Sequence, residues 1–212
     1  MRVLVIALQR LPERAARVSA RLDMLDVAHA LFPAVDGSRG EHLAWPQYDE
    51  AASLRKFGVG LLPQEIGCFA SHFSIWQRCV SENTPILVLE DDVTIHDGFP
   101  EVAELAASLV KDCDLIRLAG LVDRPFRTVR EFGDRKLVRF LRGPQGTQAY
   151  VITPKGAEAL IRAAKVWWEP VDLFLDRFWN HGVLPCAILP FEVTHGESAA
   201  RASTIGPRIK RR

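Results

Sequence analysis

The sequence predicts an α/β fold in which helices flank a mixed sheet. Short aliphatic and β-branched runs alternate along the chain with segments whose apolar residues recur at three- and four-residue steps. The order at the start is strand, helix, strand, which favours parallel pairing through a right-handed crossover. Later, a turn at Gly133-Asp134 separates two short apolar runs and indicates an antiparallel excursion, so the sheet is expected to be mixed.

The first elements follow from local patterns. Residues 3–8 predict a strand, and residues 12–25 predict a helix because a proline opens a segment with helical apolar spacing. Residues 30–35 predict a second strand, which the pair Asp36-Gly37 ends. Residues 38–62 have weak periodicity and many turn residues, so we expect a loop with one short helix.

The strongest helix is predicted to begin at Pro63, where large apolar residues form one wide stripe. They are Ile66, Phe69, Phe73, Trp76 and Val80. Glu65, Cys68 and His72 lie on a different face of this helix. The strand of residues 85–89 follows at once.

The second half of the chain continues the alternation. Further strands are predicted at 115–118, 149–152 and 184–189, with antiparallel excursions at 127–129 and 136–141. Further helices are predicted to open at Pro100, to span 154–164, and to run from Val171 through Phe178. After residue 189 we expect an irregular tail.

Length and composition limit the class of protein. With 212 residues, 48% of them hydrophobic, the chain can bury one well-covered core, so we expect a single domain over residues 1–212. A formal charge of +1 argues against nucleic acid as a partner. The four cysteines show no zinc-ligand spacing and are expected to be reduced. The first apolar run is too short for a signal peptide or a spanning helix, which predicts a cytoplasmic protein.

The C-terminal residues, about 200–212, are expected to form a flexible tail. Four of them are basic, namely Arg208, Lys210, Arg211 and Arg212. Two interpretations are open: a solvated terminus, or weak peripheral contact with an anionic inner membrane, worth on the order of 1 kcal/mol per charge.

The most specific local signal is PILVLEDDV, in which an apolar run ends in Glu90, Asp91 and Asp92. The run predicts a buried central strand, and open α/β sheets bind ligands at the carboxyl ends of such strands. Two carboxylates about 4 Å apart repel by roughly 4 kcal/mol at an effective dielectric near 20, so the cluster favours a cation between its members. Mg²⁺ and Mn²⁺ bind such oxygens and keep positions open for phosphate, which suits a diphosphate substrate. The alternative is that the three carboxylates simply end a strand and point into water.

Other candidates also carry alternatives. His195 can complete a metal site, since neutral imidazole binds Mn²⁺, or it is an exposed loop residue. His72 and Glu65 can face a ligand, or His72 is a hydrogen-bonded interfacial histidine. Asp172 can act as a general base, or it is a first-turn carboxylate favoured by the helix dipole. Residues 146–150 can lie along a sugar or form a turn that enters a strand.

Several segments together resemble glycosyltransferase family 25, the lipopolysaccharide and lipooligosaccharide sugar transferases that also include collagen galactosyltransferases. They are ALQRLPER at 7–14, PAVDG at 33–37, LLPQEIGCFASHFSIW at 61–76, ILVLEDDV at 86–93, GTQAYVITPKGA at 146–157, PVDLFL at 170–175 and STIG at 203–206. The resemblance covers nearly the whole chain in order. EIGCFASH and LEDDV are its specific parts.

This resemblance implies a GT-A-like nucleotide-sugar-binding fold with a mixed, mostly parallel central sheet, in which the acidic triplet takes the place of the DxD metal motif. It implies that Asp92 contacts the metal directly and that Glu90 lies nearer the nucleotide. The family motif does not fix the second metal ligand, and the candidate metal residues are Asp92, Glu90 and His195. The candidate nucleotide-binding residues are Leu8, Arg10, Arg14, Asp36, Gly67, Ser71, His72, Glu90, Asp91 and Gln148. The family usually has Asn where this chain has Ala7, so one polar contact is not expected here.

The implied reaction is an inverting transfer of a hexose, galactose from UDP-galactose, to a sugar hydroxyl of a lipooligosaccharide- or lipopolysaccharide-type acceptor. It implies Mn²⁺ or Mg²⁺ as cofactor, a UDP-hexose and a glycolipid or oligosaccharide as partners, and Asp172 as the base. Two alternatives remain open. One is a metal-dependent phosphohydrolase of nucleotide sugars, and the other is a non-catalytic module that binds sugar nucleotides or glycans.

Overall fold

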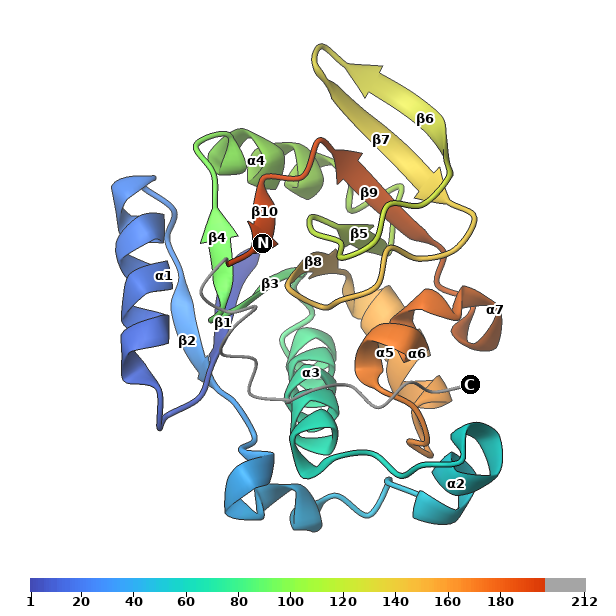
Figure 1. Cartoon of the computed structure of the whole chain (residues 1–212). Helices are drawn as coiled ribbons and strands as arrows, with labels where there is room; N and C mark the ends of the chain where they lie inside the picture. The colour runs from blue at the N-terminus through green and yellow to red at the C-terminus, as the bar shows by residue number, and fades with distance from the viewer. Residues whose placement is uncertain (197–212) are drawn as a thin grey trace.

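The computed structural model describes residues 1–196, and its centre is an eight-stranded sheet in the order β2-β1-β3-β8-β5-β9-β7-β6 (Figure 1). β8 and β7 run opposite to the other strands, so the sheet is mixed and mostly parallel. Its strands are β1 (Arg2–Ala7), β2 (Ala30–Pro33), β3 (Ile86–Glu90), β5 (Leu115–Arg117), β6 (Phe126–Phe132), β7 (Arg135–Phe140), β8 (Ala149–Ile152) and β9 (Pro185–Leu189). The predicted fold class is confirmed.

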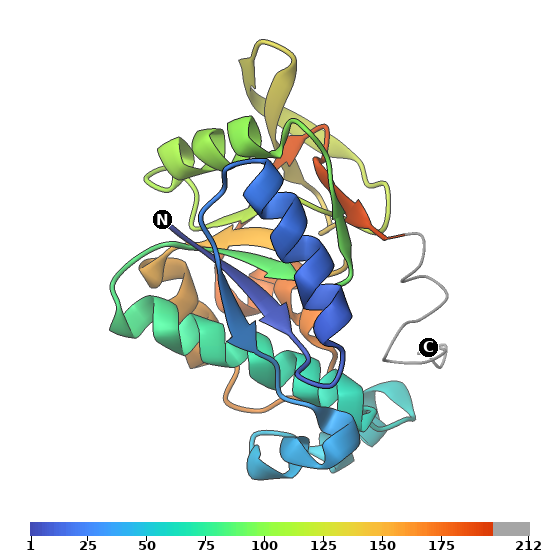
Figure 2. The ribbon, with the colours of Figure 1, turned by 90° about the vertical axis from the view of Figure 1, so that its left-hand side faces the viewer.

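Helices cover both faces of this sheet. They are α1 (Pro12–Met24), α2 (Glu50–Phe57), α3 (Pro63–Ser81), α4 (Phe99–Leu109), α5 (Pro154–Ala163), α6 (Val171–Asp176) and α7 (Phe178–His181). Figure 2 shows α3 and α4 on opposite sides of the central strands. No helix among residues 1–196 is both long enough and apolar enough to cross a bilayer.

The two hydrophobic cores follow from the alternation of side chains along each strand. Leu4 of β1 belongs to the core beneath α3, where Trp76 is fully buried. The next residue, Val5, points the other way and packs in the core beneath α1 and α4, which includes Leu22. Because both faces are covered, residues 86–89 of β3 are all apolar and buried, as PILVL predicts.

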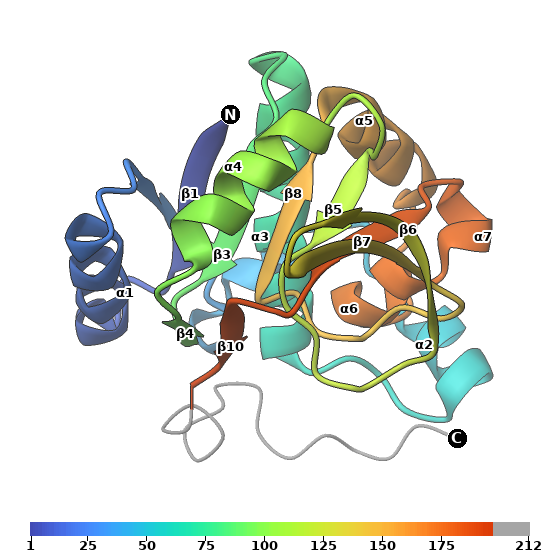
Figure 3. The same cartoon turned by 90° about the horizontal axis from the view of Figure 1, so that it is seen from above.

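The sequence patterns did not predict a two-stranded ribbon. It is made by β4 (Val93–Ile95) and β10 (Val193–His195), which pair antiparallel (Figure 3). Each strand has only three residues, which is too short for a period-two pattern to be recognised. The irregular tail predicted after residue 189 is therefore wrong for residues 193–195. This ribbon matters because it follows β3 directly and brings a late segment beside the acidic cluster.

Two smaller differences have local causes. Residues 38–62 hold α2, as the one expected helix, but also two 3₁₀ turns at Gly37–Arg39 and Glu41–Ala44. The helix predicted from Val171 through Phe178 is broken at Arg177, whose ψ of 56° is not helical. The single domain over residues 1–212 and the flexible tail stay predictions. Residues 197–212, which include the STIG segment, lie outside the described residues.

The close approach of α3 to the chain after β2 depends on Gly67. A Cβ placed there would lie 2.5 Å from the Val35 carbonyl oxygen and 2.9 Å from the Gly37 nitrogen, and both are backbone atoms. One helical turn later, the Ser71 hydroxyl accepts the Val35 N–H at 2.9 Å and donates to the Gly67 carbonyl at 2.8 Å. These contacts fix the end of β2 against α3.

We therefore expect Gly67→Ala to lower the free energy of unfolding by about 1–3 kcal/mol, because the backbone must shift to admit the methyl group. Urea unfolding measures this change. Ser108→Ala, at an exposed position of α4, is the control and should change stability by less than about 0.5 kcal/mol. A Gly67→Ala protein as stable as the wild type would contradict the close approach.

Candidate active site

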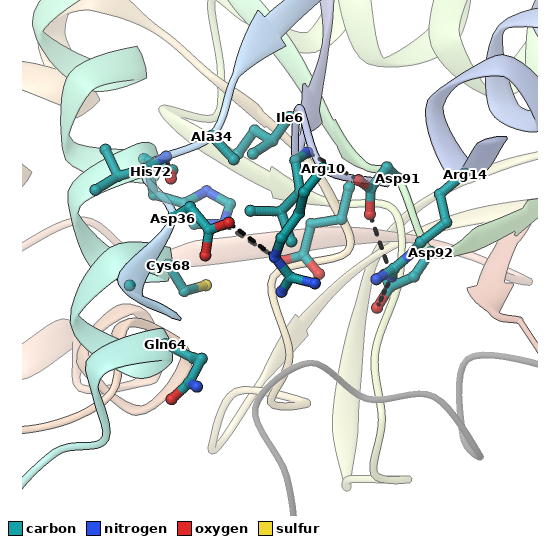
Figure 4. A pocket seen from close by; sticks show the side chains of 15 residues that line it. Ile6, Arg10, Arg14, Ala34, Asp36, Gln64, Cys68, His72, Asp91 and Asp92 are labelled. Carbon is teal, nitrogen blue, oxygen red and sulfur yellow. Dashed lines mark hydrogen bonds and ion pairs between the residues drawn. The ribbon is translucent and has the colours of Figure 1, made fainter. Parts of the chain in front are cut away.

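A cleft opens where β1, β2 and β3 end together. These strands are parallel neighbours, so their carboxyl ends meet at one edge of the sheet. The cleft holds about 640 Å³ of empty space, which includes its open mouth. Predicted residues that line it are Leu8, Arg10, Arg14, Asp36, Ser71, His72, Glu90, Asp91 and Asp92 (Figure 4).

Asp91 fastens the end of β3 to the end of β1. Its Oδ2 accepts the Leu8 N–H at 3.1 Å, and its Oδ1 lies 3.1 Å from Arg14 Nη2. Burial raises the pKa of this carboxyl and the charge of Glu90 adds to the effect, whereas the Leu8 N–H and Arg14 oppose it. Both oxygens of Asp91 thus have protein partners, and its side chain helps to build the cleft.

Asp92 has one carboxylate oxygen in an ion pair and one without a hydrogen-bond partner among residues 1–196. Its Oδ2 lies 2.8 Å from Arg14 Nη2, and Figure 4 shows this arginine between Asp91 and Asp92. Its Oδ1 is buried and has no hydrogen-bond partner within residues 1–196. Burial and the charge of Glu90 raise the pKa of Asp92 to about 6. A cation beside Oδ1 would supply the missing partner.

Glu90 belongs to a buried hydrogen-bond chain that begins in the core. Trp76 Nε1 donates to the Tyr150 hydroxyl at 3.0 Å, and that hydroxyl lies 2.9 Å from His72 Nδ1. His72 Nε2 lies 3.3 Å from Glu90 Oε1, which also accepts the Thr147 hydroxyl. Burial opposes ionisation of Glu90, but the bonds from His72 and Thr147 hold its pKa below the ordinary value. His72 is thus hydrogen-bonded, as one of the two interpretations of this residue expected, and its ring also lines the cleft.

Asp36, at the end of the second strand segment, is ionised and fully engaged. Burial would raise its pKa, but the Ser38 hydroxyl and N–H and the guanidinium of Arg10 outweigh burial and lower it. Arg10 Nε donates to Asp36 Oδ2 at 2.7 Å. The pair leaves the remaining N–H groups of Arg10 at the cleft lining.

His195 lies on β10, so the expected loop position is wrong. It pairs in register with Val93, and the N–H of the next residue, Gly196, donates to the Asp92 carbonyl at 3.0 Å. Its Nδ1 is buried and has no hydrogen-bond partner within the described chain. A positive charge on His195 would lower the pKa of both Glu90 and Asp92. The ribbon therefore brings this late imidazole to the acidic cluster.

Three other candidates lie away from the cleft lining. Glu65 caps α3, because its Oε2 accepts the Leu62 N–H at 2.9 Å, so the expectation that it faces a ligand is wrong. Gln148 meets Glu90 through its backbone carbonyl, which accepts the Glu90 N–H at 3.0 Å. Asp172 is 2% exposed in the first turn of α6, and its charge acts on Cys68 in the cleft wall.

A buried ion pair that the sequence patterns did not predict lies close to Glu90. Arg117 of β5 is fully buried, and its Nη1 lies 3.6 Å from Asp176 Oδ1. Arg117 donates to the carbonyls of Gln145 and Gly146, while Asp176 accepts the Gln145 N–H at 2.9 Å. The pair thus holds the loop that carries Thr147 to Glu90. An arginine inside an otherwise apolar strand was the available signal.

Two donor atoms near the acidic cluster are of the kinds that hold a divalent cation. Asp92 Oδ1 and His195 Nδ1 are buried without partners in residues 1–196, and a carboxylate oxygen with an imidazole nitrogen suits Mn²⁺. A second group, Cys68, His72 and Glu90, offers one donor atom each within 4.8 Å of one another. In the described part of the chain this is the one group of three or more such residues that meets this distance, so Asp92, Glu90 and His195 together do not.

A sequence model described as glycosyltransferase family 25, LPS biosynthesis protein, matches residues 1–175. The chain belongs to glycosyltransferase family 25. The family residues include β1 to β3 and α3, which are the elements that build the cleft.

Several relatives are longer than this family 25 chain. It is 33% identical to the rat probable inactive glycosyltransferase 25 family member 3, over 82% of this chain and 32% of the relative. It is 32% identical to a glycosyltransferase 25 family member of Anopheles gambiae, over 84% and 32%. It is 30% identical to the procollagen lysyl hydroxylase and glycosyltransferase of Acanthamoeba polyphaga mimivirus, over 76% and 19%. The chain thus spans a third or less of these relatives.

Among solved structures, the chain is similar to the inositol-1-phosphate CTP transferase from T. maritima. The match has a TM-score of 0.45 and 14% identity, and it covers 93% of this chain and 90% of that one.

The raised pKa of Asp92 predicts a pH-dependent effect of Asp92→Asn on the metal-free protein. The folded-state pKa is about 6, against an ordinary 3.8, so the folded protein favours the neutral carboxyl. The stability from this preference is complete below about pH 4 and is lost as the pH rises through 6. Relative to wild type, Asp92→Asn should therefore gain on the order of 2 kcal/mol between about pH 4 and pH 7.5.

Urea unfolding at the two pH values, with EDTA present, tests this expectation. The control is Asp97→Asn, because Asp97 is exposed and Arg21 lowers its pKa, so it should not show this gain. A stability difference between Asp92→Asn and wild type that does not change with pH would contradict the raised pKa of Asp92.

Proposed function

We propose that this family 25 chain is a metal-dependent inverting glycosyltransferase. It moves a hexose, galactose from UDP-galactose, to a sugar hydroxyl of a lipooligosaccharide- or lipopolysaccharide-type acceptor. The observation that carries the proposal is the acidic cluster Glu90, Asp91 and Asp92 in a cleft at the shared carboxyl edge of three parallel strands. That edge is where open α/β sheets bind nucleotides.

The charges of the cleft support a cation as cofactor. The three cluster carboxylates and Asp36 outnumber the guanidinium groups of Arg10 and Arg14 that line the cleft. A diphosphate brought beside these carboxylates would be repelled, since unit charges about 4 Å apart interact by roughly 4 kcal/mol near a protein surface. A divalent cation held by the same oxygens removes this repulsion. The proposed donor therefore binds together with Mn²⁺ or Mg²⁺.

Asp92 Oδ1 and His195 Nδ1 are the atoms that would hold the ion, and Glu90 lies toward the nucleotide. When bound, the ion would neutralise the negative charge that develops on the departing UDP. Arg14 keeps Asp92 in place through its 2.8 Å ion pair. Asp91 keeps the Leu8 backbone at the end of β1, where the nucleotide would lie.

Asp172 is proposed as the base that takes the proton from the incoming hydroxyl. Its place in the first turn of α6 puts its charge within reach of Cys68 on the cleft wall. The Asp172 carboxylate itself is buried, with 2% exposure.

A second candidate function is a non-catalytic module that binds sugar nucleotides. The observation in its favour is that a relative matching 82% of this chain is named as probably inactive. Binding and transfer need the same cleft, so the geometry serves both. Measured turnover separates them.

A donor screen that detects released UDP, with and without Mn²⁺ and acceptor, tests the function directly. We expect release only with Mn²⁺ and a sugar acceptor, and we expect Asp92→Ala to lower the rate at least 100-fold, because a ligand of the ion is lost. The matched control is Asp97→Ala, an exposed aspartate, which should keep the wild-type rate.

Three other outcomes of this screen would contradict the proposal in different ways. Release that needs no acceptor would identify a phosphohydrolase. Saturable donor binding without release would identify a binding module. Wild-type rates for Asp92→Ala in EDTA would remove the metal from the mechanism.

Asp172→Asn tests the base separately. General base catalysis contributes about 10²–10⁴-fold, so we expect kcat to fall by that factor while the Kd for UDP changes less than about threefold. Asp134→Asn, at the exposed tip of the β6–β7 hairpin, is the control and should leave both constants unchanged. Unchanged kcat in Asp172→Asn would exclude this residue as the base.

The membrane and compartment are part of the proposal as well. We place the protein in the cytoplasm and at the periphery of the inner membrane, where a glycolipid acceptor is accessible. The basic tail that would make this contact lies in residues 197–212, outside the described chain.

A further inference from the structure

We propose that Cys68, His72 and Glu90 form a Zn²⁺ site in the wall of the cleft. It shares no ligand with the proposed Mn²⁺ position, because Cys68 and His72 come from α3 and Glu90 ends β3, whereas that position uses Asp92, which follows β3, and His195, which ends β10. It also goes beyond glycosyl transfer, since nothing in that reaction requires a thiol.

The spacing of the ligands supports the site. Cys68 and His72 are four residues apart on α3, so they lie one above the other on one helical face. Their donor atoms and a Glu90 oxygen all lie within 4.8 Å of one another, and His72 Nε2 is 3.3 Å from Glu90 Oε1. With Zn–N, Zn–O and Zn–S bonds of about 2.0–2.3 Å, ligands of a tetrahedral zinc are about 3.3–3.7 Å apart. Two of the three donors are thus already at the required separation.

The groups behind these ligands also suit a metal. His72 Nδ1 lies 2.9 Å from the Tyr150 hydroxyl, which is held by Trp76, so the ring orientation is fixed. A histidine that ligates through one nitrogen usually donates its other N–H to such a partner. The Tyr150 oxygen has two lone pairs and can accept from both His72 and Trp76. Thr147 holds Glu90 in the same way by donating its hydroxyl to Oε1.

The chemistry of the three donors selects the ion. A sulfur and an imidazole nitrogen favour Zn²⁺, whereas Mg²⁺ prefers oxygen throughout. Three protein ligands leave one tetrahedral position, and all three residues line the open cleft, so that position faces water or a bound molecule. This is the pattern of an exchangeable site and not of a closed structural one.

The cysteine spacing could not reveal this site, because only one cysteine takes part. The site needs the Cys68 and His72 pair on a helix and a glutamate from the end of a neighbouring strand. Zn²⁺ bound there would link α3 to β3 in the folded protein only, so it should raise the melting temperature in a concentration-dependent manner.

Calorimetric titration of the metal-free full chain with Zn²⁺, in excess Mg²⁺, tests the proposal. We expect one Zn²⁺ per chain, and Co²⁺ in place of Zn²⁺ should give a thiolate-to-cobalt charge-transfer band. Cys68→Ser should abolish that band and weaken Zn²⁺ binding at least 10-fold, whereas Cys113→Ser, at a buried thiol away from the cleft, should keep both. Asp92→Ala should also keep the band, which separates this site from the proposed Mn²⁺ position.

Three results would overturn the site. One is a Co²⁺ spectrum of the wild-type protein without a thiolate band, a measurement that does not depend on any variant folding. Another is unchanged Zn²⁺ affinity in Cys68→Ser, and the third is loss of Zn²⁺ binding in Asp92→Ala alone. None of these readouts uses sugar transfer, so the site can fail while the proposed function stands, or the reverse.

Discussion

The structure depends on how the protein accommodates three consecutive carboxylates, one buried and two half-buried, at the end of one strand. Each has a different compensation. Glu90 is held ionised by His72 and Thr147, Asp91 is held by the Leu8 N–H and Arg14, and Asp92 shares Arg14 but keeps one buried oxygen without a partner in residues 1–196. Two of the carboxylates therefore build the cleft, and the third has capacity left for a ligand. A buried polar atom without a partner costs free energy, so this oxygen is the least expected feature of the fold unless a cation binds there.

The fold brings this cluster and its partners together by simple means. Parallel pairing of β2, β1 and β3 places three carboxyl ends at one edge, and Gly67 allows α3 to approach that edge closely. The β4–β10 ribbon then pairs His195 with Val93, the residue directly after the acidic cluster. The Arg117 and Asp176 pair holds the loop that delivers Thr147. Residues from the N-terminal, middle and C-terminal parts of the chain thus meet at one site, although each helix and strand has an ordinary local structure.

Local patterns in the sequence were sufficient for the elements and for the acidic cluster, and long-range contacts explain what they missed. PILVL predicted a buried strand because apolar residues occur without alternation, and the stripe from Ile66 predicted α3 because helical spacing is visible within one segment. The ribbon could not be predicted, since its strands have three residues each and are stabilised by one another. The interpretation of Gly67 as a pocket residue came from resemblance, whereas the structure shows it at a packing contact with the backbone of Val35 and Gly37. Cys68 was passed over because a thiol becomes a candidate ligand only when its neighbours in space are known.

The central claim is that the spare oxygen of Asp92 and the imidazole of His195 hold a cation that in turn holds the diphosphate of a sugar nucleotide. Anomalous diffraction from a crystal soaked with UDP and Mn²⁺ tests it most directly, because manganese and phosphate positions are located in one experiment. The account predicts a manganese peak in contact with Asp92 and with the UDP phosphates, at the edge where β1, β2 and β3 end. A nucleotide bound at another surface, or a cleft with UDP but no manganese at Asp92, would contradict it.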